Sequence, residues 1–189
     1  MKQRFEVEGH RGHKPLENSM EGFLKAIEFG CNGIETDLWM TKDKQIVIAH
    51  GESQFGFLRL KHKYTEERKN IYINNSNLKD FENFIDLHSN SEIIPFTEFM
   101  KEIRKHPKIY LNLEIKDPNF EILDLLERDL ILYEMPNEIR ISSFTILFKN
   151  QLLLNNDKYI KLKDVSFGFL FCSPNDLERF LEDDSKSLY

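Results

Sequence analysis

The fold is decided by the stretch GIETDLW at residues 33–39, which reads as a β-strand that carries two acids. Side chains alternate along a strand, so Glu35 and Asp37 share one face with Trp39, while the opposite face is largely apolar. A parallel strand that is covered on both sides is normally apolar throughout. The two carboxylates therefore need partners inside the sheet or barrel, since an unpaired buried charge is costly.

The stretch IYLNLEIK at residues 109–116 repeats this pattern further along the chain, with Glu114 and Lys116 on its polar face. Three readings are open for the acids of the two stretches: a solvated edge face, a buried structural ion pair, or a cation site. Carboxylates are the hard oxygen ligands that Mg²⁺ and Ca²⁺ prefer, and no cluster of cysteine or histidine accompanies them as zinc would require. A site for one divalent cation, Mg²⁺ or Ca²⁺, suits the set best, with the ligands Glu35, Asp37 and Glu114.

The rest of the chain alternates short apolar strands with amphipathic helices, which is typical of a parallel sheet. We expect strands at residues 4–10, 33–39, 45–50, 109–116, 139–144 and 164–171. We expect helices at residues 17–29, 97–105, 120–132 and 145–155, and a last helix that opens with Ser173 and Pro174. The turn at residues 40–44 is too short for a helical crossover, which leaves a local hairpin open there.

Length and composition favour a single domain over residues 1–189 with a sizeable core. The chain has 189 residues, of which 40% are hydrophobic. Residues 51–92 form the least regular stretch, which is polar and charged. Because a structureless loop of this length is unusual, we expect a small insertion there.

The charge balance and the hydropathy argue against two classes of partner. Asp and Glu outnumber Lys and Arg by 32 to 26, a formal net charge of −6, whereas a nucleic-acid binder needs a basic face. No apolar run approaches the ~20 residues of a membrane helix, and the first residues hold no apolar signal region. We expect no nucleic acid, no transmembrane segment and a cytoplasmic location.

Both cysteines, Cys31 and Cys172, are expected to be buried thiols.

Two histidines stand at strand ends beside glycines. His10 closes the first strand and is followed by Arg11 and Gly12, and His50 closes an apolar run and is followed by Gly51. A single histidine in such a place is more often structural or exposed, but two in matching places favour a functional pair. An imidazole titrates at about pH 6.5, so one can accept a proton while the other donates one. The remaining histidines read as surface residues: His13, His62, His88 and His106.

A series of short motifs follows in order along the chain. They are His10-Arg11-Gly12, Pro15-Leu16-Glu17-Asn18-Ser19, Glu35-Thr36-Asp37, Thr41-Lys42-Asp43, Ile46-Val47-Ile48-Ala49-His50 and Glu114-Ile115-Lys116. Each motif alone is weak, whereas the set at these spacings is a strong signal. Together the motifs resemble those of the glycerophosphodiester phosphodiesterase family.

This resemblance implies a distorted TIM (β/α)₈ barrel with its site at the carboxyl ends of the strands. In similar proteins the acids that match Glu35, Asp37 and Glu114 bind one Ca²⁺ or Mg²⁺. The histidines that match His10 and His50 form the general acid/base pair. The cations that match Arg11 and Lys116 hold the phosphate. The irregular stretch at residues 51–92 is similar to the small insertion that follows the second catalytic histidine in the family.

A barrel of this kind has about 250 residues and eight strands, whereas about six strands can be placed here. We therefore expect a C-terminally truncated barrel that lacks its last two strands. The strands at residues 4–10 and 164–171 are then open edges.

The resemblance implies a metal-dependent hydrolase that converts a glycerophosphodiester to glycerol phosphate and an alcohol. The expected substrate is a small glycerophosphodiester or a lysophospholipid-like molecule. Two alternatives are open: a phospholipase of the C or D type on the same barrel, and an inactive truncated barrel that acts as a binding module. The oligomeric state is open as well.

Overall fold

The computed structural model describes residues 5–52, 55–175 and 178. Its larger unit is a seven-stranded sheet with the order β11-β10-β9-β2-β3-β8 and with β1 beside β2. The strands of this sheet are β1 (Glu8–His10), β2 (Gly33–Met40), β3 (Ile46–Ile48), β8 (Ile94–Pro95), β9 (Tyr110–Ile115), β10 (Ile139–Ser143) and β11 (Ser166–Phe169). The helices around it are α1 (Met20–Glu28), α2 (Phe96–Ile103), α3 (Glu121–Leu132), α4 (Leu147–Leu154) and the short η3 (Asn156–Lys158).

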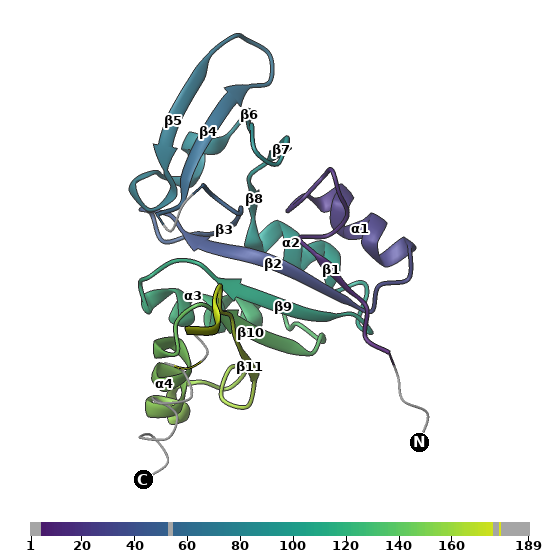
Figure 1. Ribbon diagram of the computed structural model, residues 1–189, viewed down its shortest axis with the longest axis vertical. Helices are drawn as coiled ribbons and strands as arrows, with labels where there is room; N and C mark the ends of the chain where they lie inside the picture. The colour runs from purple at the N-terminus through teal and green to yellow at the C-terminus, as the bar shows by residue number, and fades with distance from the viewer. Residues whose placement is uncertain (1–4, 53–54, 176–177, 179–189) are drawn as a thin grey trace.

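Five strands of the described chain run parallel in the order β1-β2-β9-β10-β11 (Figure 1). The strand predicted at residues 45–50 appears as β3, which pairs antiparallel with β2. The connecting turn is tight, because Thr41 N donates to Gln45 O at 2.9 Å and Lys44 adopts a positive φ of 61°. β3 is therefore the hairpin partner of β2, and the parallel strands form an open part of a TIM-like barrel.

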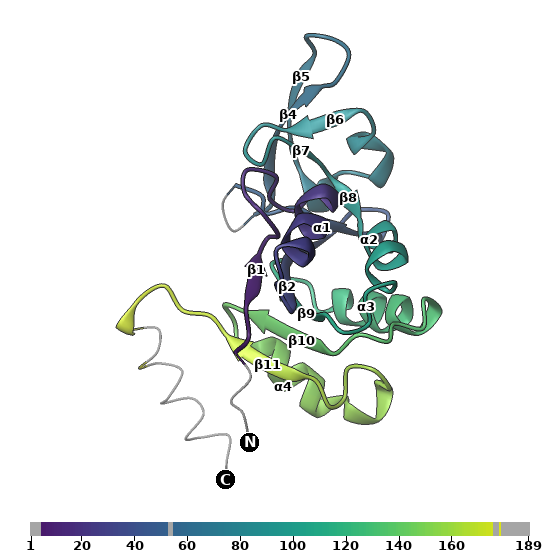
Figure 2. The ribbon, with the colours of Figure 1, turned by 90° about the vertical axis from the view of Figure 1, so that its right-hand side faces the viewer.

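The apolar positions of the central strands face the helices, which follow one side of the sheet (Figure 2). The core between sheet and helices contains Phe23, Ile34, Leu38, Phe99, Leu111, Leu113, Ile122 and Phe148. Helix α1 begins after Ser19, whose side chain accepts from Gly22 N at 3.0 Å. The helix predicted at residues 17–29 therefore starts three residues later, and Glu17 and Asn18 stay in the loop that follows β1.

A second, antiparallel sheet lies at one end of the molecule (Figure 1), with the order β5-β4-β6-β7. Its elements are β4 (Phe57–His62), β5 (Arg68–Tyr72), η1 (Ile73–Asn75), η2 (Leu78–Phe81), β6 (Phe84–Asp86) and β7 (Ser91–Glu92). This insertion has an apolar cluster of its own, which includes Leu58, Leu60 and Phe81 and is shared with Trp39 of β2. Trp39 therefore ties the insertion to the end of the strand that carries the two acids.

Both ends of the parallel series are open in the described part of the chain, because β1 pairs only with β2 and β11 pairs only with β10. Most of the helix predicted from Ser173 onward lies outside the described residues. Within the described residues, none of the helices has the length and apolar character needed to cross a bilayer. The expectation of two buried thiols is wrong: Cys31 is only half-buried, and Cys172, which lies beyond the end of β11, is exposed.

Candidate active site

The register of three parallel strands brings the predicted acids and the first histidine together. His10 lies beside Glu35 in the β1–β2 pair, and Asp37 lies beside Glu114 in the β2–β9 pair. One ligand oxygen from each of the three carboxylates lies within 4.8 Å of the others. The exposed fraction is 4% for Glu35, 0% for Asp37 and 4% for Glu114. The interpretation of these acids as a solvated edge face is therefore wrong.

Two cations neutralise part of this buried charge. Arg11 Nε lies 3.2 Å from Asp37 Oδ2, and Lys116 Nζ lies 3.4 Å from Asp37 Oδ1 and 2.7 Å from Glu114 Oε1. Glu35 Oε2 accepts from the backbone N–H of Arg11 at 2.9 Å and lies 3.9 Å from His10 Nε2. Among the described residues no Lys or Arg pairs with Glu35, so the ion-pair reading accounts for only two of the three acids.

Burial and the charge of Asp37 raise the pKa values of the two glutamates of the cluster. Burial first and the charge of Asp37 second raise the pKa of Glu35 to about 9. The same two causes raise the pKa of Glu114. A divalent cation between the carboxylates would remove this repulsion and favour their ionised forms.

The oxygen atoms of the cluster fit such a cation. Among the described residues, Glu35 Oε1, Asp37 Oδ1 and Glu114 Oε1 have no hydrogen-bond partner, and the latter two lie near the ammonium of Lys116. Buried oxygens without partners are costly, and they are the ligands that a hard divalent cation requires. The three residues present therefore suit one divalent cation held by oxygen.

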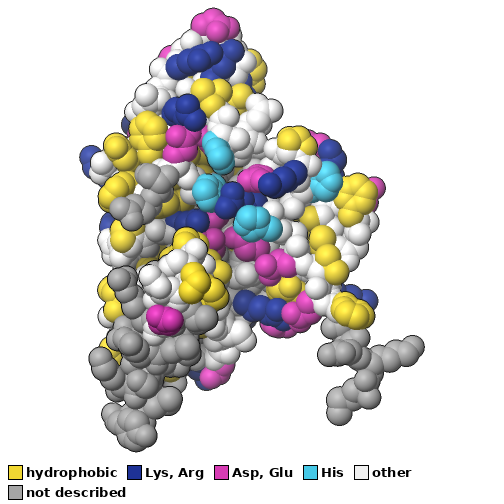
Figure 3. Space-filling view, viewed as in Figure 1, with side chains coloured by type: hydrophobic (Ala, Val, Ile, Leu, Met, Phe, Trp, Pro, Cys, Tyr) yellow, Lys and Arg dark blue, Asp and Glu magenta, His cyan; other side chains and the backbone are white. Residues whose placement is uncertain are grey.

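Unsatisfied polar atoms are concentrated at this place. Buried polar groups are normally hydrogen-bonded, yet eight buried side-chain atoms of the described residues have no hydrogen bond, although three of them lie in ion pairs. Five of them belong to the cluster: Arg11 Nε, Glu35 Oε1, Asp37 Oδ1, His50 Nδ1 and Glu114 Oε1. Figure 3 shows acidic, basic and histidine side chains gathered near the middle of one face of the molecule. This concentration points to a ligand site.

His50 follows β3 and is only partly exposed. Burial chiefly lowers the pKa of its imidazole, and the cations Arg11 and Lys116 lower it further, against the opposing effect of Asp37. No hydrogen bond or ring contact joins His50 to His10 in the described part of the chain. The structure thus places His50 within electrostatic reach of the acid cluster, and His10 beside Glu35.

Sequence reasoning did not place Asn18 among the site residues, whereas the structure places it at the centre of the site. Asn18 is buried, its Nδ2 donates to Asp37 Oδ2 at 2.7 Å, and its Oδ1 accepts from Thr36 Oγ1 at 2.9 Å. Its neighbour Glu17 accepts from Arg11 Nη1 at 3.1 Å. The signal was present in the motif at residues 15–19, which contributed to the resemblance but received no chemical interpretation.

An apolar groove of about 750 Å³ opens beside the cluster. Lys116 and His50 lie on its border, and its aromatic lining consists of Trp39, Phe55, Phe144 and Phe148. Lys116 Nζ lies 5.3 Å from the centre of the Phe144 ring. The groove therefore offers apolar surface directly next to a cation that could hold an anion.

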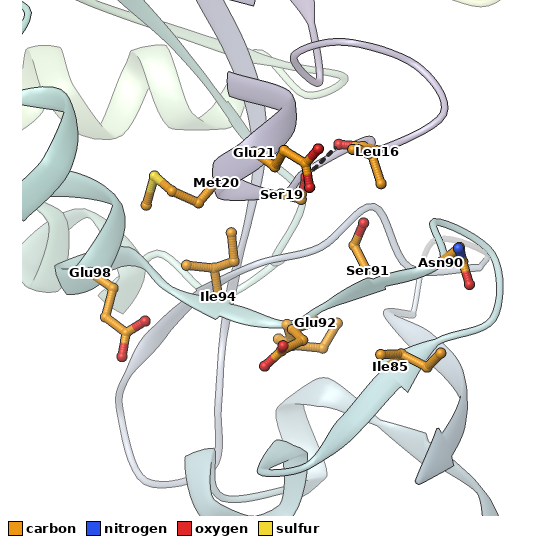
Figure 4. Close-up of a pocket in the computed structure, with 11 residues that line it drawn as sticks. Leu16, Ser19, Met20, Glu21, Ile85, Asn90, Ser91, Glu92, Ile94 and Glu98 are labelled. Carbon is orange, nitrogen blue, oxygen red and sulfur yellow. Dashed lines mark hydrogen bonds between the residues drawn. The ribbon is translucent and has the colours of Figure 1, made fainter. Parts of the chain in front are cut away.

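A different hollow, of about 430 Å³, lies between the start of α1 and the strands β7 and β8 (Figure 4). Its acids are already engaged in part, because Glu21 pairs with Lys25 and Glu92 pairs with Lys63. None of its lining residues is among the described side chains with a buried, unsatisfied polar atom. The hollow therefore lacks the buried polar atoms without hydrogen bonds that distinguish the acid cluster.

Solved structures with this architecture are known. A glycerophosphodiester phosphodiesterase of Thermotoga maritima superposes with a TM-score of 0.65 at 24% identity, over 97% of this chain and 71% of that one. An Oleispira antarctica phosphodiesterase, solved in complex with the product sn-glycerol-3-phosphate, superposes with a TM-score of 0.69 at 18% identity, over 95% and 72%. At such identities the likeness shows the fold, a TIM-like barrel that is partial here.

The family follows from a match to a family model. An uncharacterized protein of Mycoplasma genitalium is 27% identical over 161 residues, which are 78% of this chain and 63% of that protein. The chain thus spans less than two thirds of this relative. The model of the glycerophosphoryl diester phosphodiesterase family matches residues 9–136, more than half of the chain. The chain belongs to the glycerophosphoryl diester phosphodiesterase family.

Proposed function

We propose that this protein hydrolyses glycerophosphodiesters to glycerol phosphate and an alcohol, in a reaction that depends on one divalent cation, Mg²⁺ or Ca²⁺. The observation that carries the proposal is the convergence of Glu35, Asp37 and Glu114 within 4.8 Å, next to Arg11 and Lys116. Membership of the family supports the reaction type. The product held by the Oleispira antarctica relative supports a small phosphoglycerol substrate.

The acids and the cations have separate tasks in this proposal. Glu35, Asp37 and Glu114 hold the cation, which when bound supplies Lewis-acid polarisation of a phosphoryl oxygen. Arg11 binds phosphate oxygens with its planar guanidinium, and Lys116 adds a point charge. Both side chains are 16% exposed, so each presents some surface on which a phosphate can dock.

The histidines move the protons. The lowered pKa of His50 keeps its imidazole neutral at pH 7, which is the form that accepts a proton. His50 takes a proton from the attacking water or substrate hydroxyl as the new P–O bond forms. His10, whose side chain is 62% exposed at the mouth of the site, gives its proton to the leaving alcohol oxygen as the old P–O bond breaks.

Hydrolysis of glycerophosphocholine, with and without a chelator, tests the proposal. We expect activity that is lost on chelation and restored by Mg²⁺ or Ca²⁺. His10→Ala should lower kcat by about 10²- to 10⁴-fold, the usual contribution of one acid–base group. Lys25→Ala serves as the control, since Lys25 pairs with Glu21 on the surface of α1, away from the acid cluster. Activity that survives both chelation and His10→Ala contradicts the proposal.

A lysophospholipid is the second candidate substrate, and the apolar groove favours it. A single acyl chain could lie along Phe55 and Phe144 while the phosphate meets Lys116. The kcat/KM for lysophosphatidylcholine relative to glycerophosphocholine separates the two substrates. Phe144→Ala should lower this ratio if the acyl chain occupies the groove, and should leave it unchanged if it does not.

The binding-module alternative predicts binding without turnover. A chain that binds glycerol 3-phosphate and a divalent cation by calorimetry, but turns over neither substrate, would be a binding module. Turnover of either substrate excludes that alternative.

A further inference from the structure

The carbonyl oxygen of His50 accepts a hydrogen bond, whereas the Nδ1 atom of its ring has no hydrogen-bond partner among the described residues. Trp39 Nε1 donates to the carbonyl oxygen of His50 at 3.3 Å, and Gly51 follows with a φ of 68°. His50 Nδ1 is buried and has no hydrogen-bond partner among the described residues. A reactive histidine is normally oriented by a hydrogen bond at this second nitrogen. Another contact must therefore fix the plane of this imidazole.

The ring of His88 supplies such a contact. The two imidazoles are stacked, with ring centroids 5.7 Å apart and planes inclined by 23°. This separation falls within the range of attractive ring pairs. His88 comes from the insertion, 38 positions further along the chain, so the contact joins the second sheet to the candidate active site.

The turn that carries His88 is itself rigid. Asp86 is 1% exposed at the end of β6, and its carboxylate accepts from His88 N at 3.2 Å, Ser89 N at 3.2 Å and Ser89 Oγ at 3.0 Å. Its backbone is paired on both sides, with Leu60 of β4 and Ser91 of β7. A buried carboxylate with three donors therefore fixes the backbone from which the ring of His88 extends.

We infer that His88 is a positioning residue for His50: stacking from the insertion holds the plane of the His50 ring in place of the missing hydrogen bond. This inference rests on the proposed role of His50 as the proton acceptor. It gives the insertion a task in the reaction, namely to keep the acceptor nitrogen of His50 aimed at the substrate.

The charges that face His50 come from several elements. They are Asp37 on β2, Arg11 in the loop after β1, Lys116 at the end of β9 and His88 itself. Of these, only His88 lies outside the parallel sheet and its loops. Replacing His88 therefore changes one charge and one ring contact at His50 and leaves the acid cluster intact.

Two substitutions separate stacking from charge. His88→Ala removes both, whereas His88→Phe keeps a flat ring and removes the charge. His62→Ala is the matched control, because His62 lies in the same insertion and makes edge-to-face ring contacts with Phe84 and Tyr64 instead of a contact with a residue of the site. Thermal unfolding of all three variants reports the folded fraction.

We expect His88→Ala to lower kcat by about 10- to 100-fold with KM unchanged, because a small misplacement of a catalytic group has effects of this size. His88→Phe should recover most of kcat. In both variants the limb of the pH profile that belongs to His50 should move to higher pH, because the electrostatic effect by which His88 lowers the pKa of His50 is lost. A merely structural role would lower activity equally at every pH, and His88→Phe would not restore it.

The NMR signals of the His50 ring, recorded on the full chain with and without Mg²⁺, give a readout that needs no turnover. His88→Ala should shift these signals and raise their titration midpoint, and His62→Ala should do neither. If the wild type hydrolyses no substrate, the proposed function fails and the NMR signals alone decide this inference. The inference is overturned if His88→Ala leaves the His50 signals unchanged. It is also overturned if the signals change while kcat and the pH profile do not.

Discussion

Asp37 and Glu114 stand opposite each other in the parallel register of β2 and β9, and both carboxylates are buried. Glu35 lies two residues before Asp37 on the same face of β2, so three acids share one small volume. Arg11 and Lys116 supply only two of the charges needed to balance them. We therefore expect the stability of this protein to depend on a divalent cation and on pH.

A divalent cation should raise the free energy of unfolding of the wild type. At a concentration about 100 times its Kd, the gain is about 2.7 kcal/mol. Glu35→Gln should remove most of this gain without harming the cation-free fold, because Glu35 has no Lys or Arg partner among the described residues. Thermal unfolding with Mg²⁺ and with Ca²⁺ measures the effect. The surface variant Glu121→Gln, which breaks only a pair with Lys44, should keep the full gain; equal gains in all three proteins would contradict the cation site.

The cation-free protein should become less stable as pH rises. The folded pKa of Glu35, about 9, lies above its ordinary value of 4.5, so the folded state binds more protons than the unfolded state between these values. The free energy of unfolding therefore falls with rising pH across this window. Urea unfolding in the presence of chelator at a series of pH values measures the slope. Glu35→Gln should flatten the dependence of the free energy of unfolding on pH. The same slope in the variant and the wild type would show that Glu35 is not its cause.

Asn18 should raise the affinity of the site for a cation without being one of its ligands. Its amide orients Asp37 through Oδ2, and loss of such a partner typically weakens metal binding by about 10- to 100-fold. Asn18→Gly is the suitable change, because Asn18 has a φ of 53° that glycine adopts readily. Calorimetric titration with Mn²⁺ measures the loss. A variant with the affinity of the wild type would show that Asp37 needs no such support.

Glu127 should matter for stability and not for the site. Its buried carboxylate accepts from three successive backbone N–H groups, those of Ile160, Lys161 and Leu162. Glu127→Ala leaves these donors without a partner and should lower the free energy of unfolding by about 3 kcal/mol. Urea unfolding measures this, with Glu121→Ala in the exposed first turn of α3 as control. A loss no larger than that of the control would mean that water replaces the carboxylate.

The strands and the acid cluster could be predicted from local pattern. Alternation along residues 33–39 and 109–116 put the acids on one face and the aliphatic side chains on the other, and a parallel register then brings such faces together. The helices α2, α3 and α4 were predicted to within two residues at each end. The helices depend on residues that are close in sequence, and the acid cluster depends on the regular alternation of side chains along a strand.

The insertion could not be predicted in the same way. β5 alternates exposed and half-buried residues without a strong apolar face, and β6 and β7 are only three and two residues long. The contact between His50 and His88 depends on how this sheet packs against Trp39, which is a long-range property. The direction of β3 was open for a related reason, since a short turn permits the hairpin but does not require it.

The decisive measurement is a crystal structure of this protein grown with Mn²⁺, in which the anomalous signal locates the metal. We predict one peak at about 2.0–2.6 Å from oxygens of Glu35, Asp37 and Glu114, the range for cations bound by oxygen. A map with no peak among these carboxylates, while they pair only with Arg11 and Lys116, would contradict the metal-dependent site.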